Sequence, residues 1–337
     1  MVETMDAIAL LAAFDGPGHG VAEDVLRSQS GLGAEFAPAL TALADAGLLR
    51  AEDEGRWALV RWPDWLCQPV FAAALTPGGL CRRAVFLEEV NSTNTYARGL
   101  LDEPGADGTA VLATRQTGGR GRRGRQWLSE DSCGLYLSFL FRPALPLEEL
   151  QRLTLAVGVA VCRAVEHTLP ACITPTIKWP NDVLLNGRKL CGILCESAND
   201  SIGRRHVIVG VGVNTRTPTS GFGELATIAT SLEAMGAEVP PRAVLAAWIL
   251  NELADLMARW QAEGFGVVAA AYRPYLPPTG TPVTVLDSAG PAEGQLIGLA
   301  DDGALVVRLD DGTLRSIVSG EVSVKPKEGS YASGKHH

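Results

Sequence analysis

Strand patterns alternate with helix patterns from about Cys81 to Leu276, and this alternation constrains the fold more than any other feature of the chain. Such interleaving is typical of a mixed α+β domain built on a central sheet. Asn186-Gly187 lies between two of these strands and predicts a type I′ hairpin, so we expect those strands to be antiparallel neighbours. The expected strands are 84–90, 109–114, 134–141, 173–179, 182–185, 189–196 and 206–214, and the expected helices are 93–101, 147–168 and 242–263, with shorter ones near Ala229 and Val267.

The first 60 residues have a different pattern. Helical spacing over 5–14, 22–28 and 34–49 is followed by alternation over 50–60 around Asp53-Glu54-Gly55, a turn signal. Three helices and a hairpin occur in winged helix-turn-helix order, so we expect such a domain over 1–62. A segment rich in Pro and Gly follows, and it predicts a linker over 63–80.

The C-terminal 60 residues change character again after Pro277-Pro278. Roughly four short strands, separated by turns at Asp302-Gly303 and Asp311-Gly312, predict a small β-barrel over 277–325. Its core is too small to be an enzyme alone. A disordered tail is expected over 326–337, and the central domain then spans 81–276.

Three classes of protein are disfavoured by the sequence. The first residues carry acids where a signal peptide needs a basic segment, and the most apolar stretch, 153–165, is far too short to cross a bilayer. The seven cysteines include no C-x-x-C pair, which argues against a disulfide framework or a zinc site. We therefore expect a cytoplasmic protein without a membrane partner.

Residues 115–125 read RQTGGRGRRGR and hold five Arg and four Gly, with no acid between Asp107 and Glu130. Like charges in one loop repel each other unless an anion neutralises them. Gly119, Gly121 and Gly124 formally match G-x-G-x-x-G, but a strand rather than a helix follows, so the dinucleotide interpretation fails. A solvated basic loop is one alternative; we favour a phosphate-binding loop that closes over a small anion between two strands.

Two lysines stand close together in a chain whose 29 basic residues are otherwise mostly Arg. Lys178 opens Lys-Trp-Pro-Asn-Asp, and Lys189 follows the Asn186-Gly187 turn. If Lys189 faces the interior beside Gly192, it offers a compact charge to a buried anion. The alternative for either lysine is a structural ion pair, for Lys189 with Asp182 or Glu196.

Together these stretches resemble the biotin–protein ligases, also called biotin–[acetyl-CoA-carboxylase] ligases. The matching stretches are Asn91-Ser92-Thr93-Asn94, Arg115 to Trp127 with GRGRRGR, KWPND at Lys178 to Asp182, KLCGILCE at Lys189 to Glu196, Gly210 to Asn214, and Ser319 to Ser323. They occur in family order, and the combination of GRGRRGR with a downstream KWPND is highly specific. The resemblance implies a central mixed-sheet domain of the biotin/lipoate ligase type and an SH3-like C-terminal barrel.

The resemblance also implies a two-step reaction. Biotin's carboxylate attacks the α-phosphate of ATP to give biotinyl-5′-adenylate and pyrophosphate, and a lysine of a carboxyl carrier domain of acetyl-CoA carboxylase then takes the biotin. The expected cofactors are ATP and Mg²⁺, with biotin as substrate, and a homodimer is implied. Cations placed beforehand suit this chemistry because negative charge builds up on the phosphate oxygens.

The family pattern assigns roles to particular positions of this chain. Catalytic roles fall to Lys189 and Arg122. For Asp182 we add a hypothesis of our own, that it orients or deprotonates the attacking amine or helps to place Mg²⁺. Biotin binding falls to Ser92, Thr93, Asn94, Gln116, Gly119, Arg120, Arg122, Lys189 and Gly192. ATP and adenylate binding falls to Arg122, Arg123, Arg125, Trp127, Lys178, Asn181 and Asn214, with Arg122 and Arg123 nearest the adenylate; no metal ligands are assigned.

Some of these residues have a plainer interpretation. Ser92 and Thr93 could cap a helix, and Trp127 and Trp179 could be ordinary core residues. Lipoate ligation is the nearest enzymatic alternative, and a non-catalytic adenylate sensor is a further one. The GRGRRGR and KWPND pair favours biotin and catalysis.

The N-terminal domain departs from what DNA binding requires. In longer members of the family such a domain represses biotin-synthesis genes, yet residues 1–60 carry ten Asp or Glu against three Arg in a chain of net charge −9. Residues 28–49, which include the expected recognition helix, contain no Lys or Arg. Two functions stay open, ligase alone and ligase with biotin-dependent repression, and the electrostatics favour ligase alone.

Overall fold

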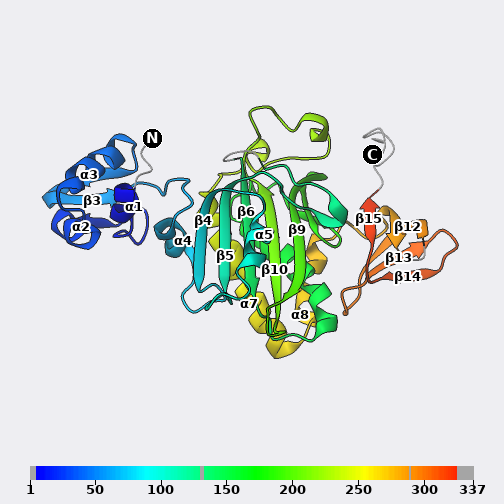
Figure 1. The fold of residues 1–337 in the computed structure, drawn as a ribbon. Helices are drawn as coiled ribbons and strands as arrows, with labels where there is room; N and C mark the ends of the chain where they lie inside the picture. The colour runs from blue at the N-terminus through cyan, green and yellow to red at the C-terminus, as the bar shows by residue number, and fades with distance from the viewer. Residues whose placement is uncertain (1–4, 130–132, 288–289, 325–337) are drawn as a thin grey trace.

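The computed structural model describes residues 5–129, 133–287 and 290–324, arranged as a central domain with a smaller module at either end (Figure 1). The expected tail at 326–337 lies outside the described residues. No helix in the described ranges is long and apolar enough to cross a membrane.

The central domain is built on a mixed seven-stranded sheet in the order β4-β5-β6-β10-β9-β8-β7, in which only β4 and β5 pair in parallel. The strands are β4 Arg83–Val90, β5 Thr109–Gln116, β6 Gly134–Phe141, β7 Thr176–Lys178, β8 Asp182–Leu185, β9 Arg188–Asn199 and β10 Arg205–Asn214. Its helices are α4 Gln68–Ala74, α5 Thr93–Gly99, α6 Leu153–Glu166, α7 Arg242–Glu263 and α8 Gly266–Tyr272. The expected mixed sheet is therefore confirmed.

The two faces of the sheet are covered unequally. Helices α6, α7 and α8 pack on one face and form the main core with it, whereas α5 alone lies on the other face (Figure 1). Strand β10 shows why: the valines at 207, 209, 211 and 213 belong to the main core, while Ile208 contacts α5 and Gly210 and Gly212 share its face. Because glycine has no side chain, this alternation leaves room on the α5 face.

The predicted hairpin at Asn186-Gly187 is confirmed. Both residues have positive φ, 49° and 74°, as a type I′ turn requires, and β8 and β9 pair antiparallel. The loop rich in Arg and Gly connects β5 to β6, as expected for a loop between two strands of the sheet.

Several sequence-based boundaries were wrong. Ala229 lies in no helix; it forms an isolated parallel bridge with Lys189. Residues 147–152 form a 3-10 helix before α6 begins, and the strand expected from 173 begins only at Thr176, after Pro175, which lacks an N–H to donate. The segment 63–80, expected to be a linker, contains helix α4, whose Val70 and Phe71 are buried in the main core.

The N-terminal module consists of three helices and a three-stranded sheet in the order β1-β3-β2. Its elements are α1 Met5–Leu11, β1 Gly20–Ala22, α2 Glu23–Ser30, α3 Phe36–Asp45, β2 Leu49–Glu52 and β3 Arg56–Leu59. The three expected helices and the hairpin are confirmed, and strand β1 had not been predicted. The buried residues of the module form a hydrophobic core of their own, and Trp62 and Trp65 pack against both this core and the main one.

The C-terminal module is a five-stranded antiparallel sheet in the order β14-β13-β12-β11-β15, one strand more than expected. Its strands are β11 Pro282–Asp287, β12 Gly290–Leu299, β13 Leu305–Leu309, β14 Leu314–Ile317 and β15 Glu321–Val324. Its buried side chains belong to the same core as the central domain, and the indole of Trp179 donates to the carbonyl of Gly303 at 3.3 Å.

Candidate active site

A cavity of about 490 Å³ opens on the α5 face of the central sheet, between the N-terminus of α5 and the loop 117–129. Ten of the residues predicted from the sequence line it together: Ser92, Thr93, Asn94, Gln116, Arg120, Arg122, Trp127, Asn181, Lys189 and Gly192. The remaining lining residues are Gly121, Tyr136, Leu137, Ile193, Leu194, Gly210, Val211 and Gly212. None of these described lining residues is Asp or Glu, so the cavity suits an anion.

The floor of the cavity depends on a pair of glycines. Gly192 on β9 and Gly212 on β10 are partners across the sheet, and the ring of Trp127 lies against both. A Cβ atom at Gly212 would come within 2.6 Å of that ring, and one at Gly192 within 2.8 Å. Any other residue at either position would displace Trp127, so these glycines are required by close approach.

Besides forming part of the cavity wall, Trp127 braces the loop and, within the described part of the chain, offers an unpartnered N–H. Its backbone N–H donates to the carbonyl of Gly119 at 3.0 Å, which ties the two limbs of the loop together. Its indole Nε1 is buried and has no hydrogen-bond partner among the described residues. Because an unpartnered buried N–H is costly, it is available to a ligand that enters the cavity.

The tip of the loop is a tight turn. Arg123 and Gly124 both have positive φ, 55° and 74°, and the N–H of Arg125 donates to the carbonyl of Arg122 at 3.2 Å. The turn directs Arg122 to the cavity and leaves Arg123 and Arg125 exposed, outside the lining. Of the two arginines expected nearest the adenylate, only Arg122 lines the cavity.

Arg122 and Lys189 are held by consecutive residues of the KWPND turn. The Nη1 of Arg122 donates to Oδ1 of Asn181 at 2.9 Å, and the Nζ of Lys189 lies 2.8 Å from Oδ1 of Asp182. The amide of Asn181 also donates to Oδ1 of Asp182 at 3.0 Å. One turn between β7 and β8 therefore positions both cations.

Lys189 has an ion-pair partner and still reaches the cavity. The alternative of a pair with Asp182 is confirmed, whereas Glu196 pairs with arginines instead. The Lys189 side chain remains 35% exposed and lies 5.4 Å from the Trp127 ring centroid, a cation–π contact. It also lies beside Gly192, as expected.

The N-terminus of α5 provides the polar end of the cavity. Ser92, Thr93 and Asn94 are all at most 4% exposed. Ser92 occupies the N-cap position without making a side-chain capping bond, and instead Gln116 Oε1 accepts from the backbone N–H of Thr93 at 2.8 Å. The capping alternative is therefore not the role of the Ser92 side chain.

Besides Arg123 and Arg125, four predicted residues lie outside the lining. Gly119 is a buried residue of the loop itself, and a Cβ there would lie 2.8 Å from Ser129 Oγ. Asn214 donates to the carbonyl of Thr230 at 2.9 Å, Lys178 is half-buried on β7, and Asp182 contacts the lining residues Lys189 and Asn181 without lining the cavity itself. Trp179, 5% exposed in the main core, fits the core alternative.

Sequence reasoning did not pick out Ser138, Gly210 or Glu196 as site residues. Ser138 is buried on β6, with Oγ 2.8 Å from Thr93 Oγ1 and 2.6 Å from Asn94 Oδ1. A Cβ at Gly210 would lie 2.4 Å from Asn94 Oδ1. A polar residue and glycines at alternate positions of otherwise apolar strands were the available signal.

A second cleft of about 1310 Å³ adjoins the first and shares Arg122, Ile193 and Leu194 with it. The C-terminal module contributes Asp302, Gly303, Ala304, Val318 and Ser319 to its lining. Cys195 lies in this lining, and burial raises the pKa of its thiol to about 11. The C-terminal module therefore borders the region that Arg122 occupies.

Comparison with known proteins agrees with this site. Residues 86–214 match the biotin/lipoate A/B protein ligase family, and residues 279–325 match the biotin protein ligase C terminal domain. The chain is 31% identical to the bifunctional ligase/repressor BirA of Bacillus spizizenii, over 80% of this chain and 82% of that protein. It is 36% identical to the biotin–[acetyl-CoA-carboxylase] ligase of Paracoccus denitrificans, over 66% of this chain and 92% of that protein.

The fold agrees as well. The biotin protein ligase from Aquifex aeolicus, solved in complex with biotin and ATP, superposes with a TM-score of 0.63 at 31% identity and covers 73% of this chain and all of that chain. The motifs, the cation-lined cavity and these similarities lead to one conclusion: the chain belongs to the biotin protein ligase family.

Proposed function

We propose that this protein is an ATP-dependent biotin–[acetyl-CoA-carboxylase] ligase, which converts biotin and ATP to biotinyl-5′-AMP and transfers the biotin to a lysine of a biotin carboxyl carrier protein. The proposal depends on one observation: Arg122 and Lys189 line the same cavity, and the described residues that line it include no carboxylate. A carboxylate and a polyphosphate repel each other, so cations fixed in advance lower the barrier to their reaction.

In the first step, an oxygen of the biotin carboxylate forms a bond to the α-phosphorus of ATP, and the bond to the β-phosphate oxygen breaks to release pyrophosphate. Lys189 and Arg122 neutralise the charge that develops on the phosphate oxygens. Both side chains are already oriented by Asp182 and Asn181, so little reorganisation is needed at the moment of reaction.

In the second step, the neutral amine of the carrier lysine forms an amide bond to the acyl carbon and loses a proton to Asp182 or to water. The bond from the acyl carbon to the phosphate oxygen breaks, and AMP leaves with its electron pair. We propose that Asp182 orients Lys189. The amine of the carrier lysine is a second candidate partner for a hydrogen bond to the Asp182 carboxylate. If Asp182→Asn leaves both adenylate formation and transfer unchanged, that assignment is wrong.

For the biotin end we propose Ser92, Thr93, Asn94 and Gln116 as polar contacts, with Gly119, Arg120 and Gly192 shaping the pocket. For the adenylate we propose Arg122, Trp127 and Asn181, with the free Nε1 of Trp127 as a donor. Arg123, Arg125, Lys178 and Asn214 lie outside the cavity lining in this conformation, so a role for them requires movement of the loop or of the strand ends.

Mg²⁺ fits this site as a companion of ATP rather than as an ion held by the protein. The described residues contain no group of three His, Cys, Asp or Glu side chains that could hold a metal. Mg²⁺ often keeps several waters and binds through one or two carboxylates together with substrate phosphates. Asp182 is the carboxylate placed to contact Mg²⁺. Because it already pairs with Lys189, it would contribute little to holding the ion.

The test of the proposed function is direct. The protein is incubated with Mg-ATP, either biotin or lipoate, and a carrier domain of acetyl-CoA carboxylase, and the carrier mass is measured. We expect addition of biotin, with pyrophosphate exchange that depends on biotin. Transfer of lipoate but not biotin would refute the choice of substrate, and the absence of any transfer or exchange would refute ligation.

We also propose a domain division: a winged helix-turn-helix module over 1–62, a linker over 63–80 that includes the packed helix α4, the catalytic domain over 81–276 and an SH3-like barrel over 277–325. The element order of the N-terminal module supports the first, and the five-stranded antiparallel sheet supports the last. A homodimer and a cytoplasmic location are part of the same proposal; the seven free cysteines suit a reducing compartment.

Biotin-dependent repression is a second candidate function, because the relative from Bacillus spizizenii is a bifunctional ligase/repressor. The charges oppose it. The exposed residues of α3 include Ala37, Pro38 and Thr41, none of them basic, and the hairpin tip carries Glu52, Asp53 and Glu54. A phosphate backbone is repelled by such a surface, so we propose that the N-terminal module contacts another protein or packs within an assembly.

A further inference from the structure

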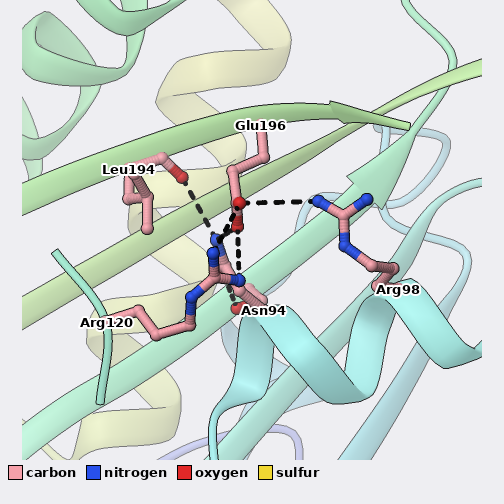
Figure 2. A network of polar contacts seen from close by, with 6 residues as sticks. Asn94, Arg98, Arg120, Leu194 and Glu196 are labelled. Carbon is pink, nitrogen blue, oxygen red and sulfur yellow. Dashed lines mark hydrogen bonds and ion pairs between the residues drawn. The ribbon is translucent and has the colours of Figure 1, made fainter. Parts of the chain in front are cut away.

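The carboxylate of Glu196 lies where strand β9, helix α5 and the loop 117–129 meet (Figure 2). Its Oε1 and Oε2 receive Nη2 and Nη1 of Arg120 at 3.0 and 3.2 Å. Nη2 of Arg98 lies 3.4 Å from Oε1, and Nδ2 of Asn94 donates to Oε2 at 2.8 Å. Glu196 therefore joins the loop, through Arg120, to α5, through Arg98 and Asn94.

We expect this contact to be stronger than a fully exposed ion pair. The Glu196 side chain is 17% exposed and that of Arg120 is 45% exposed, and the bond between them is bidentate. Exposed pairs in water contribute little, because solvent screens them and both side chains lose freedom. Partial burial and three donors to one carboxylate reduce the screening, so removal of the Glu196 charge should loosen Arg120 measurably.

The other end of the loop is tethered to the same network. Ser129 Oγ accepts from Nε2 of Gln116 at 2.9 Å, and Oε1 of Gln116 accepts from Thr93. The hydroxyl of Ser138 bonds to both Thr93 and Asn94, and Asn94 donates to Glu196. One chain of hydrogen bonds thus starts at Arg120, passes along the cavity wall and ends at Ser129, so both ends of the loop depend on it.

The Arg120 limb also has fixed points on either side of Arg120. The N–H groups of Thr117 and Gly118 donate to the carbonyls of Val90 and Asn91 at 2.9 and 2.8 Å, and Arg122 bonds to Asn181 at the tip. Arg120 otherwise forms an isolated backbone bridge with Gln126, which belongs to the same loop and cannot hold the loop to the sheet. Between these fixed points, Glu196 is the side chain that holds Arg120 itself against strand β9 and helix α5.

We propose that Glu196 is a positioning residue that keeps the loop 117–129 closed over the reaction intermediate. The proposal rests on the proposed function, because its consequence concerns an acyl-adenylate that water destroys. Glu196 does not line the cavity and acts through Arg120. Loosening it should leave formation of the intermediate largely intact and shorten the time for which the protein retains it.

The first experiment compares Glu196→Gln with the wild-type chain, supplied with biotin and Mg-ATP in the absence of a carrier. Gln keeps the shape and an acceptor for Asn94 but loses the charge that holds two guanidinium groups. Because hydrogen bonds to charged groups are the stronger ones, we expect AMP release to rise about tenfold while biotin-dependent pyrophosphate exchange at saturating substrate changes by less than about threefold.

Glu89→Gln is the matched control. Glu89 pairs with Arg115 at 2.9 Å near the same end of the sheet, but the two side chains are 52% and 50% exposed. The substitution removes the same charge from a carboxylate–arginine pair that screening makes weak. AMP release from this variant should stay within about twofold of the wild-type rate.

A double-mutant cycle with Arg120→Gln tests whether Glu196 works through that arginine. If it does, Glu196→Gln combined with Arg120→Gln should release AMP no faster than the more affected single variant. Multiplication of the two effects would overturn the proposed route. Arg120→Gln also serves as the second variant should Glu196→Gln not fold, since it breaks the same pair from the loop side.

Limited trypsinolysis supplies a readout without substrate, because the arginines at 115–125 make the loop a natural target. We expect faster cleavage there in Glu196→Gln than in wild-type protein or Glu89→Gln. Wild-type rates of both cleavage and AMP release in Glu196→Gln would overturn the proposal. If the wild-type chain produces no adenylate at all, the proposed function fails, and trypsin still decides whether Glu196 holds the loop.

Discussion

The two terminal modules lie at opposite ends of the central domain (Figure 1), and they are attached to it in different ways. The N-terminal module has a core of its own, to which Leu10, Phe36 and Leu43 contribute. The buried residues of the C-terminal module belong instead to the main core of the molecule. Hydrophobic cores unfold cooperatively, so the C-terminal module is part of the catalytic unit and the N-terminal module is a separate one.

The contacts at the two junctions follow the same division. On the C-terminal side, the turn at Gly303 inserts between Leu155 and Phe265 and accepts a bond from Trp179 of the KWPND motif. On the N-terminal side, Asp64 caps helix α7 by accepting from the backbone N–H of Arg242 at 2.7 Å. The C-terminal junction contacts the motif that orients Arg122 and Lys189. The N-terminal junction contacts helix α7, on the face of the sheet opposite the cavity.

The largest expected effect lies in the catalytic unit. Lys189→Met removes a charge fixed at the cavity, and we expect adenylate formation to fall by about 10³-fold because preorganised charge stabilisation is lost. Pyrophosphate exchange measures it. Arg50→Met is the counterpart in the N-terminal module, an exposed arginine paired with Glu52, and it should leave exchange unchanged. A comparable loss in both variants would contradict the division.

The second prediction concerns the separate core. Leu43 is fully buried in the N-terminal module, and Leu43→Ala should destabilise that module by about 3 kcal/mol through lost burial and a cavity. Calorimetry should show one unfolding transition shifted to lower temperature and a second unchanged, with carrier biotinylation within twofold of wild type. A single transition that moves as a whole, with falling activity, would show that the two cores are coupled.

The third prediction uses two glycines of similar conformation. Gly303 has φ of 85°, and a Cβ there would lie 2.9 Å from Leu155 Cδ1, so Gly303→Ala should cost about 2 kcal/mol and reduce adenylate formation through Trp179. Gly47 has φ of 65° with nothing within 4 Å of an added Cβ, so Gly47→Ala should cost about 1 kcal/mol of strain alone. Equal rates of pyrophosphate exchange in Gly303→Ala and Gly47→Ala would contradict the proposed link between Gly303 and the KWPND motif.

The fourth prediction asks whether the separate module reads DNA. Fluorescence anisotropy is measured with labelled DNA from upstream of biotin-synthesis genes, at several salt concentrations, with and without biotin and Mg-ATP. Because the first 60 residues carry ten acids and three arginines, we expect no binding even at low salt from protein active as a ligase. Sequence-specific binding that requires biotin and ATP would establish the repressor function instead.

The smallest expected effect is chemical. Burial raises the pKa of the Cys195 thiol to about 11, so below that pH the group stays neutral and unreactive in the folded catalytic unit. Iodoacetamide at pH 8 should modify the exposed Cys172 first and Cys195 only after unfolding, as peptide mass analysis can show. Rapid native alkylation of Cys195 would mean that the second cleft opens further than the structure indicates.

Local sequence patterns were sufficient for much of the fold. Asn186-Gly187 specified its hairpin because only residues that tolerate positive φ fit a type I′ turn. The run of arginines and glycines could be placed between two strands because strand alternation is a local property. Helix α4 in segment 63–80 was missed because Pro63, Pro69, Pro77 and the pair Gly78-Gly79 indicated a linker, while the burial of its Val70 and Phe71 depends on elements elsewhere in the chain.

The sequence alone determined which residue types were available for the chemistry: two lysines, a basic glycine-rich loop, the KWPND motif and glycines at alternate strand positions. Only the tertiary structure decided their partners. Lys189 faces Asp182 rather than Glu196, and Glu196 joins Arg120 to Asn94, which lies 102 positions away. Such contacts depend on strand register and on which face each side chain takes, and no local pattern fixes register between strands so far apart in the chain.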